Sequence, residues 1–380
     1  MKRARMGTAL GTLCGLLLAA GAEANYTMAD FQAARKFDAH VHANADDSVF
    51  LDIARKDGFE LLSINVDYPD FPTLQLQAQI AHSLQAADPK RFHYATTFSM
   101  KGFGSDRWTR ETNKRLDEEI NRGALAVKVW KNIGMVEKDA QGHLIMLDNP
   151  GFDGVMQHIE ALHVPLIAHQ AEPKNCWLPL EQMSTENDRS YFKDHPEYYM
   201  YLHPEQPSYE SLMAARDRFV ARNPKLSFVG AHMASLEWSV DVLAKFLDAY
   251  PNTTVDLAAR MTQVQYQSQR DFGKVRQFFI RYQDRLLYGT DLTAEPSSVS
   301  QKAQNPPIEA GNFSHEADTF WRSDWMYLAT PGVQHVDAIA ADVRGLALPK
   351  TVIDKIYYKN ARRVFHLDFA HVHAARTPDP

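Results

Sequence analysis

The chain has 380 residues, of which 45% are hydrophobic and 23% are charged, and its formal net charge at pH 7 is -6. This is the composition of an ordinary globular protein that is long enough to form a large hydrophobic core. The slightly acidic balance excludes the basic field that binds nucleic acid or an anionic membrane surface. We therefore expect a small-molecule substrate and no nucleic-acid partner.

Residues 1–24 are predicted to be a secretory signal peptide and not a part of the fold. Basic side chains precede an apolar run at 8–20, and residues 22–24 form a small-x-small cleavage site. The apolar run is short for a transmembrane span, and the residues before Cys14 lack the pattern of a lipoprotein signal. We therefore expect an exported protein, periplasmic or secreted, without a stable membrane anchor. Cys176 would then be the one cysteine left, so we expect no internal disulfide.

Apolar runs rich in β-branched residues alternate with helical segments along most of the chain. The predicted strands are residues 37–43, 59–66, 92–98, 124–130, 164–168, 226–231, 253–258 and 286–289. The predicted helices are residues 76–88, 106–122, 151–162, 209–222, 239–250, 272–282 and 349–365, the last of them packed on the barrel exterior. The repeated strand and helix units predict an α/β fold, a closed parallel (β/α)8 TIM barrel in a single domain over residues 25–380. A doubly wound open sheet is the alternative.

Two predicted connections are longer than a barrel needs, at residues 131–150 and 171–207. Loops of this length in a compact domain are usually functional. The second connection is rich in aromatic residues, namely Trp177, Tyr191, Phe192, Tyr198, Tyr199 and Tyr201. These rings can form a lid over a pocket or can simply pack the loop onto the barrel, and the sequence leaves both interpretations open.

The C-terminal ends of the predicted strands carry residues of metal-binding and catalytic types. In the first strand, His40 and His42 point to the same face because side chains alternate with a period of two, so they can share one metal ion. The later strands end at Lys128, His169, His232 and Asp291. Catalytic residues of (β/α) barrels lie at this end of the strands. Packing alone would hardly place so many such residues there.

The segments around these residues are specific when they are taken together. They are Asp38-Ala39-His40-Val41-His42, Leu166-Ile167-Ala168-His169, Gly230-Ala231-His232, Gly289-Thr290-Asp291, and the C-terminal stretch from Gly345-Leu346 to Ala361. This set resembles the amidohydrolase superfamily, and its details are similar to the amidohydrolase-related branch of mononuclear hydrolases and decarboxylases. The resemblance covers nearly the whole chain after the signal peptide.

The resemblance implies that His40, His42 and Asp291 bind one divalent metal ion, with His169 as a further ligand in a single-ion site. Imidazole and carboxylate ligands favour zinc, with manganese or iron as alternatives. A bound ion lowers the pKa of its water toward about 7. Asp291 would take the proton of that water and deliver it to the leaving group. His232 would polarise or orient the substrate oxygen, or bind a second ion.

Lys128 leaves the number of ions open. In binuclear relatives, the lysine that ends the fourth strand is carbamylated and bridges two metal ions. The histidines that end the fifth and sixth strands, which correspond to His169 and His232 here, hold the second ion. In single-metal relatives, a lysine at this place serves as a cation. The resemblance therefore implies one or two ions, with Lys128 either as a bridging ligand or as a cation.

Substrate contacts are predicted just past the strand ends, at Trp130, Trp177 and Arg260. Asp256 and Arg260 bracket the end of the seventh predicted strand. The guanidinium of Arg260 can hold a substrate carboxylate through two hydrogen bonds, or it can form an ion pair with a neighbouring acid. The sequence leaves these two roles open.

The leading hypothesis for function is a metal-dependent hydrolase of an amide, lactone or related bond. The second hypothesis, also from the resemblance, is a metal-dependent, non-oxidative decarboxylase of an aromatic acid. The third is a non-catalytic metal-binding barrel. Asp291 counts against the third, because metal retention alone does not need a carboxylate placed for proton transfer. A homo-oligomer is compatible with the sequence.

Overall fold

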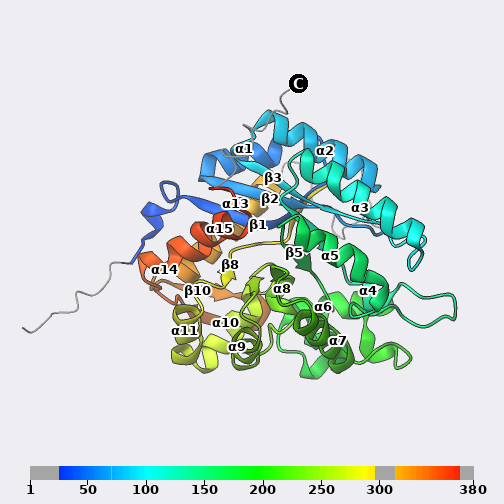
Figure 1. Ribbon diagram of the computed structural model, residues 1–380. Helices are drawn as coiled ribbons and strands as arrows, with labels where there is room; N and C mark the ends of the chain where they lie inside the picture. Colours follow the sequence, from blue (N-terminus) through cyan, green and yellow to red (C-terminus); the bar gives the residue numbers. More distant parts are fainter. Residues whose placement is uncertain (1–24, 70, 296–312, 369–380) are drawn as a thin grey trace, which may run out of the picture.

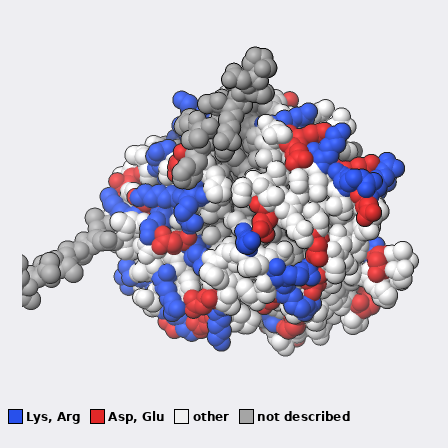
Figure 2. Space-filling view, in the orientation of Figure 1, with Lys and Arg blue, Asp and Glu red and all other residues white. Residues whose placement is uncertain are grey.

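The computed structural model describes residues 25–69, 71–295 and 313–368. The predicted signal peptide at residues 1–24 lies outside the described residues. Among the helices of the described part, none is long and apolar enough to cross a membrane. Figure 2 shows Lys and Arg side chains interspersed with Asp and Glu over the visible face.

Nine parallel strands form a curled sheet with helices around it, which is a TIM-barrel-like arrangement (Figure 1). The strands are β1 (Lys36–Ala43), β2 (Phe59–Ile64), β3 (Phe92–Thr97), β4 (Ala126–Val129), β5 (Leu166–Ala168), β6 (Phe228–Gly230), β7 (Thr253–Asp256), β8 (Leu286–Leu287) and β9 (Leu292–Ala294). Their order is β8-β7-β6-β5-β4-β3-β2-β1-β9, so strands that follow one another in the chain lie side by side. This sequential order differs from that of a doubly wound open sheet, which was the alternative to the predicted barrel.

The eighth predicted strand, residues 286–289, is wrong in its bounds. Only residues 286–287 form a strand there, β8, which pairs with β7; a further strand, β9, follows at residues 292–294 and pairs with β1. Between them the carbonyl oxygen of Tyr288 accepts the backbone N–H of Ala39 at 2.9 Å, and the N–H of Asp291 donates to the carbonyl of His40 at 2.8 Å. The chain therefore passes from one edge of the sheet to the other here. This crossing places Asp291 beside the end of β1.

Helices cover the outside of the sheet. Those that the sequence predicted are α2 (Leu74–Ala87), α3 (Asp106–Asn121), α5 (Asp153–Ala161), α7 (Tyr209–Arg222), α9 (Val240–Ala249) and α11 (Phe272–Arg281). Several begin at a side-chain cap; for example, Ser208 accepts the N–H of Ser211 and Ser239 that of Val242. The sequence did not predict α1 (Val49–Asp57), α10 (Met261–Arg270), α13 (Phe313–Ala329) or the hairpin of β10 (Val333–Val336) and β11 (Ala341–Arg344). The stretch that forms α10 is rich in glutamine, so its apolar period is weak.

The last predicted helix, residues 349–365, closes the barrel core and does not only lie on its exterior. It consists of α14 (Lys350–Asp354), a π-helical segment at Lys355–Lys359 and α15 (Asn360–Val364). The ring of Phe365 stacks on Phe37, at the start of β1, with 6.1 Å between ring centroids. Tyr358, Ala361 and Val364 join the same cluster as the inward-facing strand residues, because those apolar side chains need a cover at the N-terminal end of the sheet.

The two long connections contain structure of their own. The first holds α4 (Asn132–Met135), and the second, which we call the inserted segment (residues 171–207), holds α6 (Glu186–Asp194) between 3-10 turns. The inserted segment has a small core of Cys176, Met183, Phe192 and Tyr199. Phe192 and Tyr199 thus pack the segment, as the simpler of the two interpretations expected. Tyr191 and Tyr198 line a cavity instead.

Two buried carboxyl groups lie between the sheet and α13. The hydroxyl of Tyr288 donates to Asp324 at 2.9 Å, and the indole N–H of Trp321 donates to Asp38 at 2.9 Å. Burial is the main cause that raises the pKa of Asp38 and of Asp324 to about 7. The fold therefore favours the protonated form of Asp324, and the unfolded chain does not.

This raised pKa predicts a stability that depends on pH. The protonated carboxyl of Asp324 stabilises the folded state fully below about pH 4, where this carboxyl is also protonated in the unfolded chain. That stabilisation is lost as the pH rises through about 7. Asp324→Asn keeps the shape and cannot titrate. We expect the free energy of unfolding of the wild type, relative to this variant, to fall by on the order of 3 kcal/mol between pH 4 and pH 7. Urea unfolding at several pH values measures it, with the exposed Asp248→Asn as control. If the free energy of unfolding changed with pH in the same way in the wild type and in Asp324→Asn, the raised pKa of Asp324 would be contradicted.

Candidate metal centre

His40 and His42 lie near the end of β1 and face the interior of the sheet, while Val41 packs into the outer core, as predicted. The Nδ1 of His40 lies 2.8 Å from the Oδ2 of Asp256, and the Nδ1 of His42 lies 2.8 Å from the carbonyl oxygen of Ile64. A carboxylate and a carbonyl can only accept, so each Nδ1 carries the proton in the neutral ring. Each Nε2 therefore keeps its lone pair, which is the form of histidine that binds a metal ion.

Asp291 meets both histidines. Its Oδ1 lies 3.4 Å from the Nε2 of His40 and 3.2 Å from the Nε2 of His42. Burial alone would raise the pKa of Asp291, but the imidazoles of His232, His42 and His40 hold it well below its usual value. The carboxylate is therefore ionised at neutral pH. The backbone of Asp291 has a φ of 71°, a left-handed conformation, at the crossing between β8 and β9.

His232 follows β6 in a turn of unusual backbone geometry. His232, Met233, Ala234 and Ser235 have φ values of 56°, 58°, 57° and 57°, and each left-handed residue costs about 1–2 kcal/mol. Backbone and side-chain contacts hold the turn: the N–H of His232 donates to Asp256 at 2.7 Å, and the hydroxyl of Ser235 donates to the carbonyl of Ala171 at 3.0 Å. Strain of this kind collects at functional sites, where the surrounding structure fixes it.

Gly230 is required by this turn, because a Cβ at that position would lie 2.5 Å from the Cβ of Ala234. The Nδ1 of His232 lies 2.9 Å from the carbonyl oxygen of Ala258. As in His40 and His42, this contact protonates Nδ1 and leaves the lone pair on Nε2. The turn therefore presents the metal-binding nitrogen of His232 toward the site.

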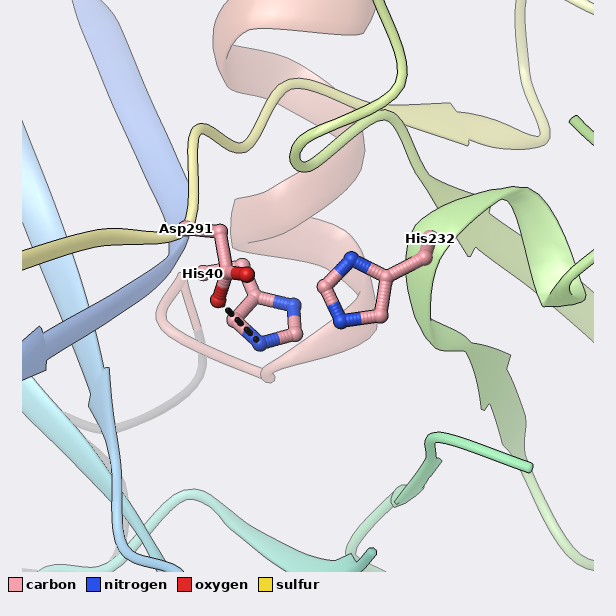
Figure 3. A group of neighbouring side chains, drawn as sticks. All are labelled: His40, His232 and Asp291. Atoms are coloured by element: carbon pink, nitrogen blue, oxygen red, sulfur yellow. Dashed lines mark ion pairs between the residues drawn. The ribbon is translucent and has the colours of Figure 1, made fainter. Parts of the chain in front are cut away.

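The ligand atoms of His40, His232 and Asp291 all lie within 4.8 Å of one another. Figure 3 shows that the three side chains point toward a common space from three different segments of the chain. His42 joins them through its contact with Asp291. Burial lowers the pKa of His40 and His232, so both rings are neutral at neutral pH.

His169 and Lys128 lie at the edge of this group. The ring of His169 lies 4.2 Å from that of His232, between centroids, and its Nε2 lies 3.1 Å from the carbonyl oxygen of Ala171. Burial is the main cause that lowers its pKa well below the usual value. The Nζ of Lys128 lies 3.5 Å from the Nε2 of His40, and burial lowers the pKa of Lys128 to about 8. All the predicted strand-end residues therefore gather in one place.

Two cavities adjoin the group. One, of about 330 Å³, is lined by Tyr68, Phe71, Trp130, Lys131, Tyr191 and Tyr198 among others. Its Phe71 ring lies 5.1 Å from the His42 ring, and its Trp130 ring lies 6.1 Å from the His169 ring. The other, of about 480 Å³, is lined by Asp291 and Thr290 and by residues of α10 and α13. Both cavities are large enough for a small molecule.

The three residues predicted to touch substrate lie in different surroundings. Trp130 lines the aromatic cavity. Trp177 packs against Tyr209, with 5.5 Å between ring centroids, and donates to the carbonyl of Pro207 at 3.1 Å. These contacts place Trp177 within the packing of the inserted segment, so its predicted substrate contact gains no support. Arg260 is buried, and it directly follows Ala258, whose carbonyl oxygen contacts His232, and Ala259, which lines the cavity of Asp291.

A family model described as Amidohydrolase matches residues 15–367 of the chain. The chain belongs to the amidohydrolase family. No curated protein matches it. The fold of this amidohydrolase is similar to that of 2,6-dihydroxybenzoate decarboxylase in complex with 2,6-dihydroxybenzoate, at 16% identity and a TM-score of 0.50 over 88% of this chain and 99% of the other.

Two further solved structures are similar to this amidohydrolase at lower scores. One is 5-carboxyvanillate decarboxylase from Sphingomonas paucimobilis, at 12% identity and a TM-score of 0.47 over 88% of this chain and 99% of the other. The second is 4-oxalomesaconate hydratase from Rhodopseudomonas palustris, at 14% identity and a TM-score of 0.44 over 87% of this chain and 86% of the other. Such likenesses concern the fold alone.

Asp256 is the functional residue that sequence reasoning missed. The sequence places Asp256 only at the end of the seventh predicted strand, close to the predicted substrate contacts. Its Oδ2 holds the Nδ1 of His40, and its Oδ1 accepts the N–H groups of His232 at 2.7 Å and of Ala258 at 3.2 Å. The one available signal was an acid at the end of a buried strand, which normally needs a partner.

The two carboxylate oxygens of Asp256 make different contacts, one with the ring of His40 and the other with backbone N–H groups. The variant Asp256→Asn distinguishes the effects of these two sets of contacts. The amide oxygen can keep the backbone bonds to His232 and Ala258, whereas the amide nitrogen would donate to Nδ1 of His40 and move the ring proton to Nε2. We expect zinc affinity to fall about 10–100-fold with little change in unfolding temperature. Competition with a fluorescent chelator measures the affinity, and Asp248→Asn on the surface is the control. Unchanged affinity in Asp256→Asn would refute the role given to Asp256.

Proposed function

We propose that this amidohydrolase is a metal-dependent hydrolase of an amide, lactone or related bond, exported from the cell. The observation that carries the proposal is the arrangement of His40, His42 and His232. Each has its Nδ1 against a carboxylate or carbonyl oxygen, so its Nε2 is free to act beside the carboxylate of Asp291. Hydrogen bonding at Nδ1 thus directs the Nε2 of all three rings toward a ligand role, beside the anionic oxygen of Asp291.

This donor set fits a divalent ion, and zinc best, because zinc takes imidazole nitrogen and carboxylate oxygen in small, four-coordinate sites. His40, His42 and Asp291 would hold the ion, with His232 or His169 completing the set. A bound divalent ion supplies positive charge that polarises a carbonyl group and makes water a nucleophile at neutral pH.

The protein's own groups supply the proton transfers. Asp291 is ionised, since its neighbours hold its pKa well below the usual value, so it can accept a proton from an attacking water and then deliver it to the leaving group. His232 donates its Nδ1–H to Ala258, so in its neutral form it offers only a lone pair at Nε2. It therefore serves as a ligand or a proton acceptor, and it must be protonated before it can polarise a substrate oxygen.

Replacing Asp291 by Asn tests the proton-transfer role. The amide cannot accept the proton, so we expect kcat on a true substrate to fall about 10²–10⁴-fold. A panel of lactones and amides, assayed with zinc-loaded protein, supplies the measurement, and metal content is determined in parallel. Asp241→Asn, an exposed partner of Lys274, is the matched control. Turnover that survives within a few-fold in Asp291→Asn would exclude this role.

Decarboxylation of an aromatic acid is the second candidate. The observation that favours it is the aromatic cavity beside His42 and His169, whose rings of Tyr68, Phe71 and Trp130 suit a flat substrate. Release of carbon dioxide from hydroxybenzoates, measured beside hydrolysis of lactones and amides, distinguishes the two reactions. If the protein binds metal but turns over neither the hydroxybenzoates nor the lactones and amides, the result would favour the hypothesis of a non-catalytic metal-binding barrel.

The number of ions is a separate prediction. His40, His232 and Asp291 form one compact group of ligand atoms among the described residues, and the Nε2 of His169 is engaged by Ala171. We therefore expect one zinc ion per chain, whether or not bicarbonate is added. Metal analysis of freshly purified protein gives the count. Two ions per chain that depend on bicarbonate would show instead that Lys128 is a carbamate bridge.

A further inference from the structure

Arg260 is a buried guanidinium without an ion pair. It lies directly before α10, follows the left-handed residue Ala259, and is 8% exposed. Its Nη1 donates to the carbonyl oxygen of Ala259 at 2.9 Å. Its Nε is buried and has no hydrogen-bond partner among the described residues. Among the described residues, no carboxylate lies within ion-pair distance of it.

The other deeply buried arginine shows how such a group is normally satisfied. Arg216, which is 2% exposed, pairs with Asp217 at 2.7 Å and donates to the carbonyl of Ala234. A buried charge without such partners is destabilising by several kcal/mol. Arg260 therefore occupies a position that packing alone would not favour.

The charge of Arg260 acts on the candidate metal centre. It contributes to the lowered pKa values of His169 and His232. Glu237 is also near enough to feel it, since burial raises the pKa of Glu237 and Arg260 opposes that rise. Glu237 uses Oε1 to accept the N–H of Lys174 at 2.8 Å, and its Oε2 has no hydrogen-bond partner in the part of the chain that the structure describes. The backbone places Arg260 at the site: the carbonyl oxygen of Ala258 lies 2.9 Å from the Nδ1 of His232, and Ala259 lines the cavity of Asp291. Among the described residues, no carboxylate in direct contact balances the guanidinium.

We propose that Arg260 binds a carboxylate of the substrate, so that this enzyme acts on organic acids. A planar guanidinium with an unused Nε–H and Nη–H matches a carboxylate through two parallel hydrogen bonds. The sequence left open whether Arg260 pairs with a neighbouring acid, and the described residues contain no such pair. The inference rests on the proposed function for the place of the reaction, because the carboxylate would lie next to His169 and His232.

Binding of simple acids tests the inference without a known substrate. Benzoate and acetate are the probes, and benzamide is the neutral analogue of benzoate. Calorimetry is done with the full protein, both zinc-loaded and after chelation, because a bound ion can itself hold a carboxylate. We expect benzoate or acetate to bind the wild type in both states. Arg260→Gln should weaken that binding at least about tenfold in both states, while benzamide binding stays unchanged.

Two further variants serve as controls in the binding experiment. Arg260→Lys keeps the charge without the paired donors, so a loss of only a few-fold is expected, and it serves if Arg260→Gln does not fold. Arg270→Gln, on the exposed end of α10 where Arg270 lies over Tyr266, is the matched control and should bind like the wild type.

The inference is overturned if Arg260→Gln binds benzoate and acetate as the wild type does, or if the wild type binds neither. It is also overturned if the double variant Glu237→Gln with Arg260→Gln recovers binding, because Arg260 would then only balance Glu237. Failure of the proposed function looks different: binding of acids would still depend on Arg260, but no metal-dependent turnover would be found.

Discussion

The carboxylate of Asp256 connects the parts of this site that come from different strands. It holds Nδ1 of His40 on β1 with one oxygen and the backbone N–H groups of His232 and Ala258 with the other. Burial alone would raise its pKa, but the hydrogen-bonded imidazole of His40, the nearby imidazole of His232 and the charge of Lys128 keep that pKa below its usual value, so Asp256 remains ionised. One anion at the end of β7 therefore fixes a ring tautomer on β1 and the start of the strained turn after β6.

The strain around this anion is concentrated where the ligand side chains are. Asp291 and the turn from His232 to Ser235 have left-handed backbones, which are unfavourable for residues with a Cβ. The parallel sheet offsets that energy, because its strands and its outer core hold the ends of both segments in place. Such pre-organisation is what a metal or transition-state site needs, since little has to move when charge develops.

The sequence predicted the elements whose signals are local. Alternation along β1 correctly put His40 and His42 on one face with Val41 behind, and the repeated strand and helix units gave the parallel order of the sheet. The signals failed where tertiary contacts decide. The stretch of residues 286–294 splits into β8 and β9 because it must cross between two sheet edges, and α10 is polar enough to hide its period.

The candidate site shows the same division. Its strand-end ligands were visible because each is a polar residue after an apolar run. The support from Asp256 was not visible, because its partners are far away in the chain and two of them are backbone groups. Nor does any pattern reveal that Arg260 is unpaired while Arg216 is paired, since this depends on what packs around each guanidinium. Trp177 illustrates the reverse case, a conspicuous residue whose contacts are ordinary packing.

The central claim is that the Nε2 atoms of the β1 histidines and the carboxylate of Asp291 share one ion. Anomalous diffraction from a zinc-loaded crystal, recorded on both sides of the zinc absorption edge, tests it most directly. The account predicts a single strong peak about 2.0–2.2 Å from the Nε2 of His40, the Nε2 of His42 and an oxygen of Asp291. A peak bound through Nδ1, or an ion held elsewhere in the chain with this space left empty, would contradict it.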